Sequence, residues 1–416
     1  MNRILPILFS LLISSSAYAQ HNISGHLKTQ ITFTDFRAQD LQNVLGSKNS
    51  LSNQLDFRLN YEYMHDRFKF DAQTEALSLY SNALDTQRSI LNQNPFALSQ
   101  SLLINDRRRL FDLTNEFQDD TEVTSVVRLD RLSASYLGDQ TVLKVGRQAL
   151  SWGNSLIFQA IDPFNPFSPT EIDKDYKTGD DMVYSQYLFE SGADIQAIVI
   201  PRRDPLTGNL NGDQSTFASK FKGTLSDFEI EYDLVAGRHY DENILGIGIS
   251  KPIGEALWRF DASYTEINSG NNIWNIVTNI DQSWVIRDTN VYGYLELYHS
   301  GLGTSENNYQ TIKPALLDRI NRGELFTIGK NYLASGLRIE LTPLVNFYPV
   351  NILNLADRSG FAQFKIQYDF LQNTSLLIGL NLPYGDRGTE FGGIPTGTGS
   401  YLTAGTSGYL RLSFFF

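Results

Sequence analysis

The side chains in this sequence that are best suited to chemistry are charged, and six of them fall in one segment. The segment runs from Gly146-Arg147-Gln148 through residues 151–180, which contain three prolines and three phenylalanines. Charges at a narrow point of a water-filled passage act on a passing ion or solute. An exterior loop that packs on its neighbours is an equal alternative. The candidate constriction residues are Arg147, Asp162, Asp173, Lys174, Asp175 and Lys177.

A second charged segment, residues 81–123, carries three consecutive arginines, Arg107, Arg108 and Arg109. Guanidinium groups bind carboxylates and phosphates in a bidentate manner, so these side chains could meet an anionic solute or the phosphates of lipopolysaccharide. A solvated charged turn is the interpretation we favour. The apolar residues of 110–114 would then dock inside or return toward the neighbouring sheet.

Two lysines and two glutamates flank a predicted tight turn near residue 226. With that turn, Lys222 lies beside Glu229, and Lys220 lies beside Glu231. Cross-strand ion pairs on a solvated wall contribute roughly 0.2–1 kcal/mol each. The alternative is a charge field that acts on a solute.

Catalysis and metal binding have little support in the sequence. The five histidines are isolated from one another, and there is no cysteine. A catalytic triad needs a nucleophile, a base and an orienting partner that converge in space. We therefore expect no catalytic residues, no metal site and no cofactor.

These charges must be positioned by strands, because apolar and polar residues alternate along most of the chain. In residues 228–234, Phe228, Ile230, Tyr232 and Leu234 oppose two glutamates and an aspartate, a pattern with the period of a β-strand. The pattern predicts 18 strands, with 16 as the alternative. Their approximate ranges are 23–33, 51–63, 68–76, 124–137, 140–150, 181–190, 192–201, 214–225, 227–237, 243–251, 255–267, 273–287, 290–300, 331–342, 346–355, 360–370, 374–383 and 402–416.

Short and long connections alternate between these strands, as in transmembrane barrels with short periplasmic turns and long extracellular loops. We therefore predict an all-β, antiparallel, closed transmembrane barrel, and consider a soluble β protein the weaker alternative. The apolar faces then meet lipid and the charged faces line the lumen, which stays aqueous at this strand number unless something fills it. The predicted lumenal acids are Asp56, Glu62, Asp71, Glu75, Asp130, Asp233, Asp261, Glu296 and Asp369.

The N-terminus reads as a secretory signal peptide, residues 1–19, with Arg3, an apolar stretch and an Ala17-Tyr18-Ala19 cleavage site. Residues 20–416 then form a single barrel domain. The net charge of −12 excludes the basic surface that non-specific nucleic-acid binding needs. A mean hydropathy of −0.25 is compatible with strands that alternate apolar and polar residues.

The last strand has an apolar face formed by Leu410, Leu412, Phe414 and Phe416. It resembles the C-terminal signal strand of Gram-negative outer-membrane barrels, which the barrel assembly machinery recognises and which closes the barrel. Gly146-Arg147-Gln148, followed by Trp152-Gly153 and a long loop of proline, asparagine and phenylalanine, resembles porin-like families of the alginate-export and phosphate-selective types.

These resemblances imply an integral protein of the outer membrane, in contact with lipid and lipopolysaccharide, that forms a channel for small polar or charged solutes. The alternatives are a structural or surface barrel without transport, the membrane sheath of a larger complex, or an exporter of an anionic polysaccharide. We expect that the protein is not an enzyme. The sequence does not identify the solute.

Overall fold

The computed structural model describes residues 19–93, 103–164, 166–172, 175–267, 270, 272–305, 309 and 311–416. The predicted signal peptide lies outside these residues, except for Ala19, which begins the first strand. No helix in the described part of the chain is long and apolar enough to cross a membrane.

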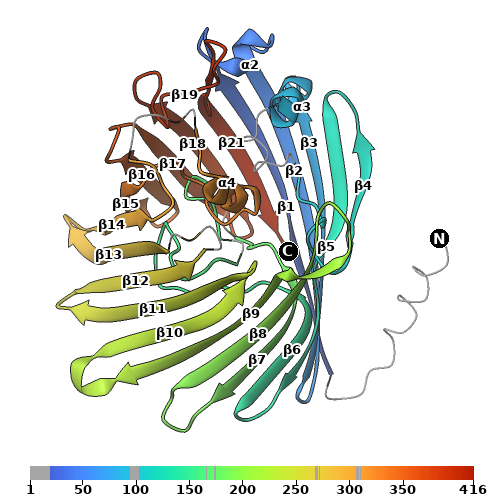
Figure 1. Cartoon of the computed structure of the whole chain (residues 1–416), viewed down its shortest axis with the longest axis vertical. Coiled ribbons are helices and arrows are strands. Elements are labelled where there is room, and N and C mark those ends of the chain that lie inside the picture. The colour runs from blue at the N-terminus through green and yellow to red at the C-terminus, as the bar shows by residue number, and fades with distance from the viewer. Residues whose placement is uncertain are drawn as a thin grey trace.

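Eighteen antiparallel strands form a closed ring, and a nineteenth, β4, pairs with the same sheet (Figure 1). Strand β21 pairs with both β18 and β1, which closes the ring. The predicted strand number and fold class are therefore confirmed. The ring strands are β1 (Ala19–Asp35), β2 (Asn49–His65), β3 (Phe68–Ser81), β5 (Val123–Leu137), β6 (Thr141–Gln148), β7 (Asp180–Leu188), β8 (Asp194–Arg203), β9 (Leu210–Leu225), β10 (Ile230–His239), β11 (Glu242–Ile253), β12 (Ala256–Glu266), β13 (Ile273–Ile286), β14 (Thr289–Ser300), β15 (Asn331–Thr342), β16 (Val345–Asn354), β17 (Gly360–Leu371), β18 (Thr374–Tyr384) and β21 (Thr406–Phe415).

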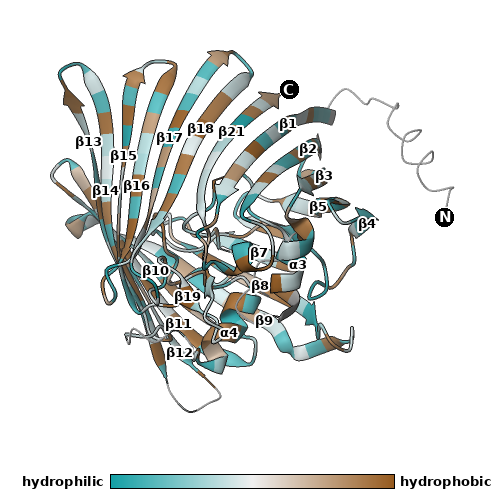
Figure 2. Cartoon of the chain, turned by 90° about the horizontal axis from the view of Figure 1, so that it is seen from above, coloured by the Kyte–Doolittle hydropathy of each residue, from teal (hydrophilic) through white to brown (hydrophobic). Residues whose placement is uncertain are grey.

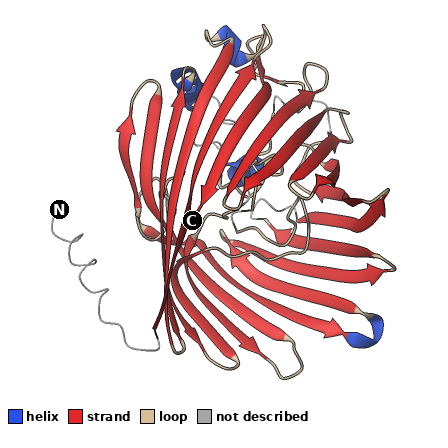
Figure 3. Ribbon diagram, turned by 180° about the vertical axis from the view of Figure 1, so that it is seen from behind, coloured by secondary structure: helices blue, strands red, loops and turns tan. Residues whose placement is uncertain are grey.

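The remaining elements lie in the connections. Connections at one end of the ring, which we call the loop end, carry the helices and the short extra strands, whereas the other end, the turn end, has mostly tight turns (Figure 3). The one exception is a 3-10 turn, η1, at the turn end. These elements are α2 (Leu41–Val44), α3 (Leu84–Gln93), β4 (Thr114–Asp119), η1 (Ser226–Phe228), α4 (Pro314–Asn321), β19 (Ile394–Pro395) and β20 (Tyr401–Leu402).

Alternate residues of each strand point to opposite sides of the barrel wall. In β2, Leu55, Phe57 and Leu59 are exposed on the outside, whereas Arg58 and Asn60 are buried on the inside. Figure 2 shows the resulting stripes of hydrophobic and hydrophilic residues along the strands. In β21, Leu410, Leu412, Phe414 and Phe416 are all exposed, which agrees with the predicted lipid-facing side.

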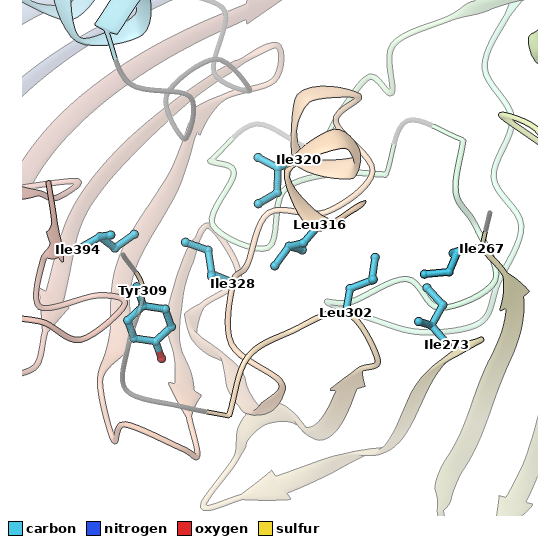
Figure 4. Packing of buried hydrophobic residues seen from close by; sticks show 8 residues of the cluster. All are labelled: Ile267, Ile273, Leu302, Tyr309, Leu316, Ile320, Ile328 and Ile394. Carbon is cyan, nitrogen blue, oxygen red and sulfur yellow. The ribbon is translucent and has the colours of Figure 1, made fainter. Parts of the chain in front are cut away.

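The buried apolar clusters lie inside the ring, where connections pack on inward-facing residues. One cluster joins helix α4, through Leu316 and Ile320, to Leu302 and Tyr309 (Figure 4). A second surrounds Trp152, and a third surrounds Phe158. The loop-end part of the lumen is therefore filled by the protein's own connections.

Candidate functional site

The connection between β6 and β7, which we call the constriction segment (residues 151–179), folds into the lumen. Trp152 is 1 % exposed, and its indole N–H donates to Gln196 Oε1 on β8 at 2.8 Å. Six strands further round the ring, the backbone N–H of Phe158 donates to Glu296 Oε1 on β14 at 2.7 Å. Because the segment bonds to inward-facing residues of two strands that lie well apart round the ring, the structure resolves the two alternatives in favour of the lumen.

Two carboxylates on the wall hold the segment by its backbone. Asp261 Oδ2 accepts the N–H groups of Asn154 and Ser155 at 2.8 and 3.1 Å, and the Ser155 hydroxyl at 2.7 Å. Glu296 accepts the next three N–H groups, those of residues 156–158, at 2.7 to 3.3 Å. Five consecutive N–H groups, which no helix or strand satisfies, are thus bound by two side chains that are both 0 % exposed.

Aromatic packing fixes the same segment. The ring of Phe158 stacks on Tyr298 with centroids 4.4 Å apart and lies 5.5 Å from Tyr332. Trp152 meets Phe164 edge-on at 5.2 Å. Phe164 is buried, and Phe167 is half-buried. Large aromatic groups supply most of the packing in such a plug.

Of the candidate residues in this segment, Asp162 and Lys177 bind each other rather than a passing solute. The Lys177 ammonium donates to Asp162 Oδ2 at 2.7 Å, and both side chains are buried. Burial raises the pKa of the Asp162 carboxyl and outweighs the attraction of Lys177. The pair joins the middle of the segment to its C-terminal end, and the Lys177 ammonium also donates to the Leu150 carbonyl at 2.5 Å. Asp173 and Lys174 lie outside the described residues.

Toward the turn end, the segment contacts basic side chains of the wall. Asp175 accepts from Lys28 on β1 at 2.6 Å, and its side chain is 54 % exposed. The guanidinium of Arg58 lies 4.2 Å from the ring centroid of Tyr176. This is a cation–π geometry. Asp175 is therefore a predicted candidate that does line open space.

The inward arginines of β2 and β5 are paired with two acids in one buried network. Arg58 binds Glu75 at 2.7 Å and Asp130 at 2.9 Å. Arg128 binds the same two acids, and Arg131 binds Asp130 at 2.6 Å. All five side chains are buried. Breaking one member would leave a buried charge without compensation, so this network stabilises the wall.

Arg147 also differs from its predicted role, because it lies inside the wall and not at the constriction. It donates to Asp181 through Nε at 2.9 Å and to Asp106 Oδ2 through Nη1 at 3.0 Å. Its Nη2 donates to the Phe111 carbonyl at 2.6 Å. Gly146 directly before it has a φ of +121°, which L side chains rarely adopt, and a Cβ there would lie 2.2 Å from the Leu132 carbonyl oxygen. The Gly-Arg-Gln sequence is thus a structural motif.

The three consecutive arginines belong to the same part of the wall. Strands β6 and β7 are short, and the segment before β4 covers the space above them: the N–H of Arg203 on β8 donates to the Arg108 carbonyl at 3.0 Å. Arg109 binds Asp106 at 2.7 Å, and Arg107 is exposed. Burial raises the pKa of Asp106, but Arg109 and Arg147 outweigh it and lower the pKa overall. These arginines are therefore not constriction residues.

The predicted pairing of Lys222 with Glu229 and of Lys220 with Glu231 is wrong, because β9 and β10 pair in a different register. The turn after β9 includes η1, and Glu229 follows it with a φ of +53°, so Glu229 is a turn residue. Lys222 therefore lies opposite Asp233 and binds Glu231 diagonally at 3.0 Å. The Lys220 ammonium lies 3.7 Å from Asp233. The longer turn shifts the whole hairpin relative to the prediction.

A second connection covers the loop end: the α4 loop, residues 311–330. His239 Nε2 lies 3.1 Å from Glu324 Oε1, and Arg319 binds Glu242. Burial raises the pKa of Glu324, but Arg322, His239 and Arg319 together lower it to about 2. Two cavities of about 40 and 20 Å³ remain here, and Gln159, Glu324 and Leu325 line both.

A larger cavity, about 500 Å³, lies at the turn end, and we call it the turn-end cavity. Such a volume accommodates a small organic molecule. The cavity has lining groups of both charges and several neutral polar groups. They include Asp175, Tyr348, Lys365, Gln367, Asp369, Arg411 and Ser413.

The alternation of residues predicted that Asp261 and Glu296 face inward, but nothing in the sequence connected them to the constriction segment. Nothing in the sequence gave Arg319 or Glu324 a role either, because they lie in a loop whose apolar and polar residues do not alternate. In the described part of the chain, no group of three or more potential metal ligands occurs.

Comparisons with known proteins identify relatives by fold only. No protein-family model matches the chain. No curated protein matches it either.

Solved structures match over nearly the whole chain. OccAB1 of Acinetobacter baumannii has a TM-score of 0.55 at 10 % identity, covering 95 % of this chain and 96 % of that one. A BenF-like porin of Pseudomonas fluorescens Pf-5 has a TM-score of 0.52 at 12 % identity, covering 96 % and 98 %. OccK2 (OpdF) of Pseudomonas aeruginosa, solved with glucuronate, has a TM-score of 0.51 at 10 % identity, covering 95 % and 98 %. The chain thus shares its fold with outer-membrane porins.

Proposed function

We propose that this protein is an outer-membrane channel for the diffusion of small polar or charged solutes. The observation that carries the proposal is the constriction segment, which crosses the lumen of a closed barrel and leaves a polar cavity of about 500 Å³ below it. A barrel that served only as a scaffold would not need a polar chamber of this size. The porins that share the fold support the proposal.

The solute path follows the seam between the constriction segment and the α4 loop. Both cavities at the loop end lie along this seam, at Gln159 and Leu325. Each connection is bonded to the wall, and among the described residues no hydrogen bond joins residues 151–164 to residues 311–327. Small movements of either connection would widen the seam and open a route to the turn-end cavity.

Location and assembly follow from the two ends of the chain. Residues 1–19 direct export, and residues 20–416 form the barrel domain in contact with lipid and lipopolysaccharide. The C-terminal strand is the signal for the barrel assembly machinery. In support, the Phe416 carbonyl accepts the Gly25 N–H at 2.8 Å, so the last residue takes part in ring closure.

The charges at the turn-end cavity suit a small solute with both hydrogen-bond donors and acceptors. Lys365 and Arg411 lie on β17 and β21, with Asp369 on the same wall. Glucuronate, the ligand present in the OccK2 structure, is a suitable probe of this size and chemistry. Polysaccharide export is the weaker alternative, because the packed loop end is too narrow for a polymer.

The test is planar-bilayer recording of the refolded protein, together with swelling of proteoliposomes in glucuronate, glucose and sucrose. We expect discrete conductance steps and swelling that decreases with solute size. Deletion of residues 155–178 should increase the conductance, because it removes the constriction. A correctly folded, SDS-resistant barrel that shows no conductance steps in either form would refute the channel and favour a non-transporting barrel.

A further inference from the structure

We propose that Asp261 and Glu296 are positioning residues that hold the constriction segment against the lumen wall and thereby set the width of the channel. The inference rests on the channel proposed above. It assigns a role to two buried acids that the pattern of the sequence places in the lumen without giving them a function.

The first argument is the number and order of the bonds. Five successive backbone N–H groups, from Asn154 to Phe158, donate to the two carboxylates, and the bonds pass from Asp261 to Glu296 between Ser155 and Leu156. Hydrogen bonds to the backbone do not depend on which side chains the segment carries. Position, and not side-chain chemistry, is thus what these bonds determine.

The second argument is the orientation of the acids by the wall. Asp261 is on β12 and Glu296 is on β14, separated by β13. Asn279 on β13 lies directly opposite Glu296 and donates to its Oε2 at 3.1 Å. The side-chain amide of Asn154 donates to Asp261 Oδ1 at 3.2 Å. Glu296 is therefore oriented by its own wall, whereas the further bond of Asp261 comes from the segment itself.

The third argument is the space that the wall leaves for this contact. Gly248 on β11 pairs with Asp261 across the sheet. A Cβ at Gly248 would lie 2.7 Å from Asn154 Nδ2 and 2.8 Å from Asp261 Oδ1. Gly153, at the start of the bonded run, has a φ of +108°. Glycine at both positions permits the close approach of the segment to the wall.

The fourth argument is charge. Neither carboxylate forms an ion pair with a lysine or arginine in the described ranges, and both are fully buried. The N–H groups of the segment are their main compensation. If the segment leaves the wall, water must replace these donors, because a buried unpaired charge is costly. Detachment of the segment and hydration of the lumen therefore occur together.

The direct test replaces the acids by their amides, Asp261→Asn and Glu296→Gln, singly and together. Each amide keeps the shape but loses the charge and one acceptor oxygen. Loss of a charge-assisted hydrogen bond should shift the ratio of wide to narrow states by about tenfold or more. We expect larger or noisier conductance steps, with the double variant changed most. The matched control is Glu62→Gln, a lumenal carboxylate on β2 that is bonded to Lys69 on the adjacent strand β3 and lines none of the three cavities.

A second readout does not depend on conductance. Amide hydrogen exchange at residues 154–158 should be slow in the native protein and fast in the double amide variant, while the SDS-resistant, heat-modifiable form persists. Unchanged protection of these amides in a folded double variant would overturn the proposal, whether or not the protein conducts. A native protein without conductance would refute only the proposed channel.

A reversible test uses the absence of cysteine from the native chain. Ser155 Oγ and Asp261 Oδ2 are 2.7 Å apart, so the double variant Ser155→Cys with Asp261→Cys places two thiols in contact. Oxidation should restore the narrow conductance and reduction should release it, with the Ser155→Cys single variant unaffected by either. Equal conductance of the oxidised and reduced double variant would contradict the assignment.

Discussion

The loop-end and turn-end halves of the lumen are lined by the same strands but are filled differently. At the loop end, the cavities measure about 40 and 20 Å³, and the charged groups are buried in pairs. At the turn end, a cavity of about 500 Å³ leaves Asp175, Lys365 and Asp369 partly exposed. The difference arises from the connections, because only the loop-end connections fold back into the ring.

This contrast teaches that a charge on the inner face of a strand has no fixed role. Arg58 and Lys365 both point inward, yet Arg58 is 1 % exposed and bonded to two acids, whereas Lys365 is half-buried beside the turn-end cavity, with its ammonium 5.7 Å from the ring centroid of Tyr348. The connection that covers a charge decides whether it stabilises the fold or meets a solute. The predictions below test that distinction.

The largest effect is expected for Arg147→Met at the loop end. The change leaves Asp181 buried without its arginine and Asp106 with Arg109 alone, which should cost about 3–5 kcal/mol of unfolding free energy. The turn-end counterpart, Lys365→Met, should cost less, because this half-buried side chain lies beside a cavity where water can replace its contacts. Urea unfolding of both refolded proteins in detergent measures the difference, and equal losses would remove the distinction between the two halves.

The next effect concerns the packing of the constriction segment. Phe158→Ala removes a ring that stacks on Tyr298, and comparable truncations cost about 3–5 kcal/mol. Because the loss is confined to the segment, we expect more frequent wide conductance states and faster proteolysis near residue 158, with the barrel intact. The control is Phe228→Ala in an exposed turn. If both variants behave like the native protein, the segment is not held by this stack.

A smaller effect is expected at the α4 loop when the pH is lowered. The pKa of Glu324 is about 2 in the folded protein, below its ordinary value of 4.5. The unfolded loop therefore binds the proton more readily, so the stabilisation is complete above pH 4.5 and decreases as the pH falls toward 2. Single-channel recordings between pH 6 and 2.5 should show that the α4 loop, which covers the loop end, loosens as the pH falls.

Glu324→Gln is the control for that transition. The variant should already behave at pH 6 as the native protein does in acid, and should lose the part of the pH dependence that Glu324 causes. Asp106, whose pKa is also lowered, titrates in the same direction and should still respond. An unchanged pH profile in the variant would show that the protonation of Glu324 does not loosen the α4 loop.

The smallest effect is expected for the exposed pair of Lys222 and Glu231, whose side chains are 40 % and 54 % exposed. Solvent-screened pairs of this kind contribute roughly 0.2–1 kcal/mol, and the lower part of that range applies here. A double-mutant cycle with Lys222→Met and Glu231→Gln measures the coupling. A coupling as large as the effect of Arg147→Met would contradict the distinction between paired buried charges and exposed ones.

The sequence predicted all eighteen ring strands, because alternation is a local signal that each strand carries for itself. It missed β4, whose residues Thr-Asn-Glu-Phe-Gln-Asp do not alternate. It also shifted the lysine–glutamate hairpin, since the turn conformation at Glu229 has no clear signature. The bonds from Asp261 and Glu296 to residues 154–158 join positions far apart in the chain, and no local pattern encodes such contacts.

The pairing of Gly25 with Phe416 has a consequence for how the protein folds. Its two N–H···O bonds join residues from opposite ends of the chain. The ring therefore has its longest-range contact at the very pair that closes it, and contacts of long sequence separation form slowly. We therefore expect ring closure to follow the formation of the hairpins between neighbouring strands, which join residues close together in the sequence.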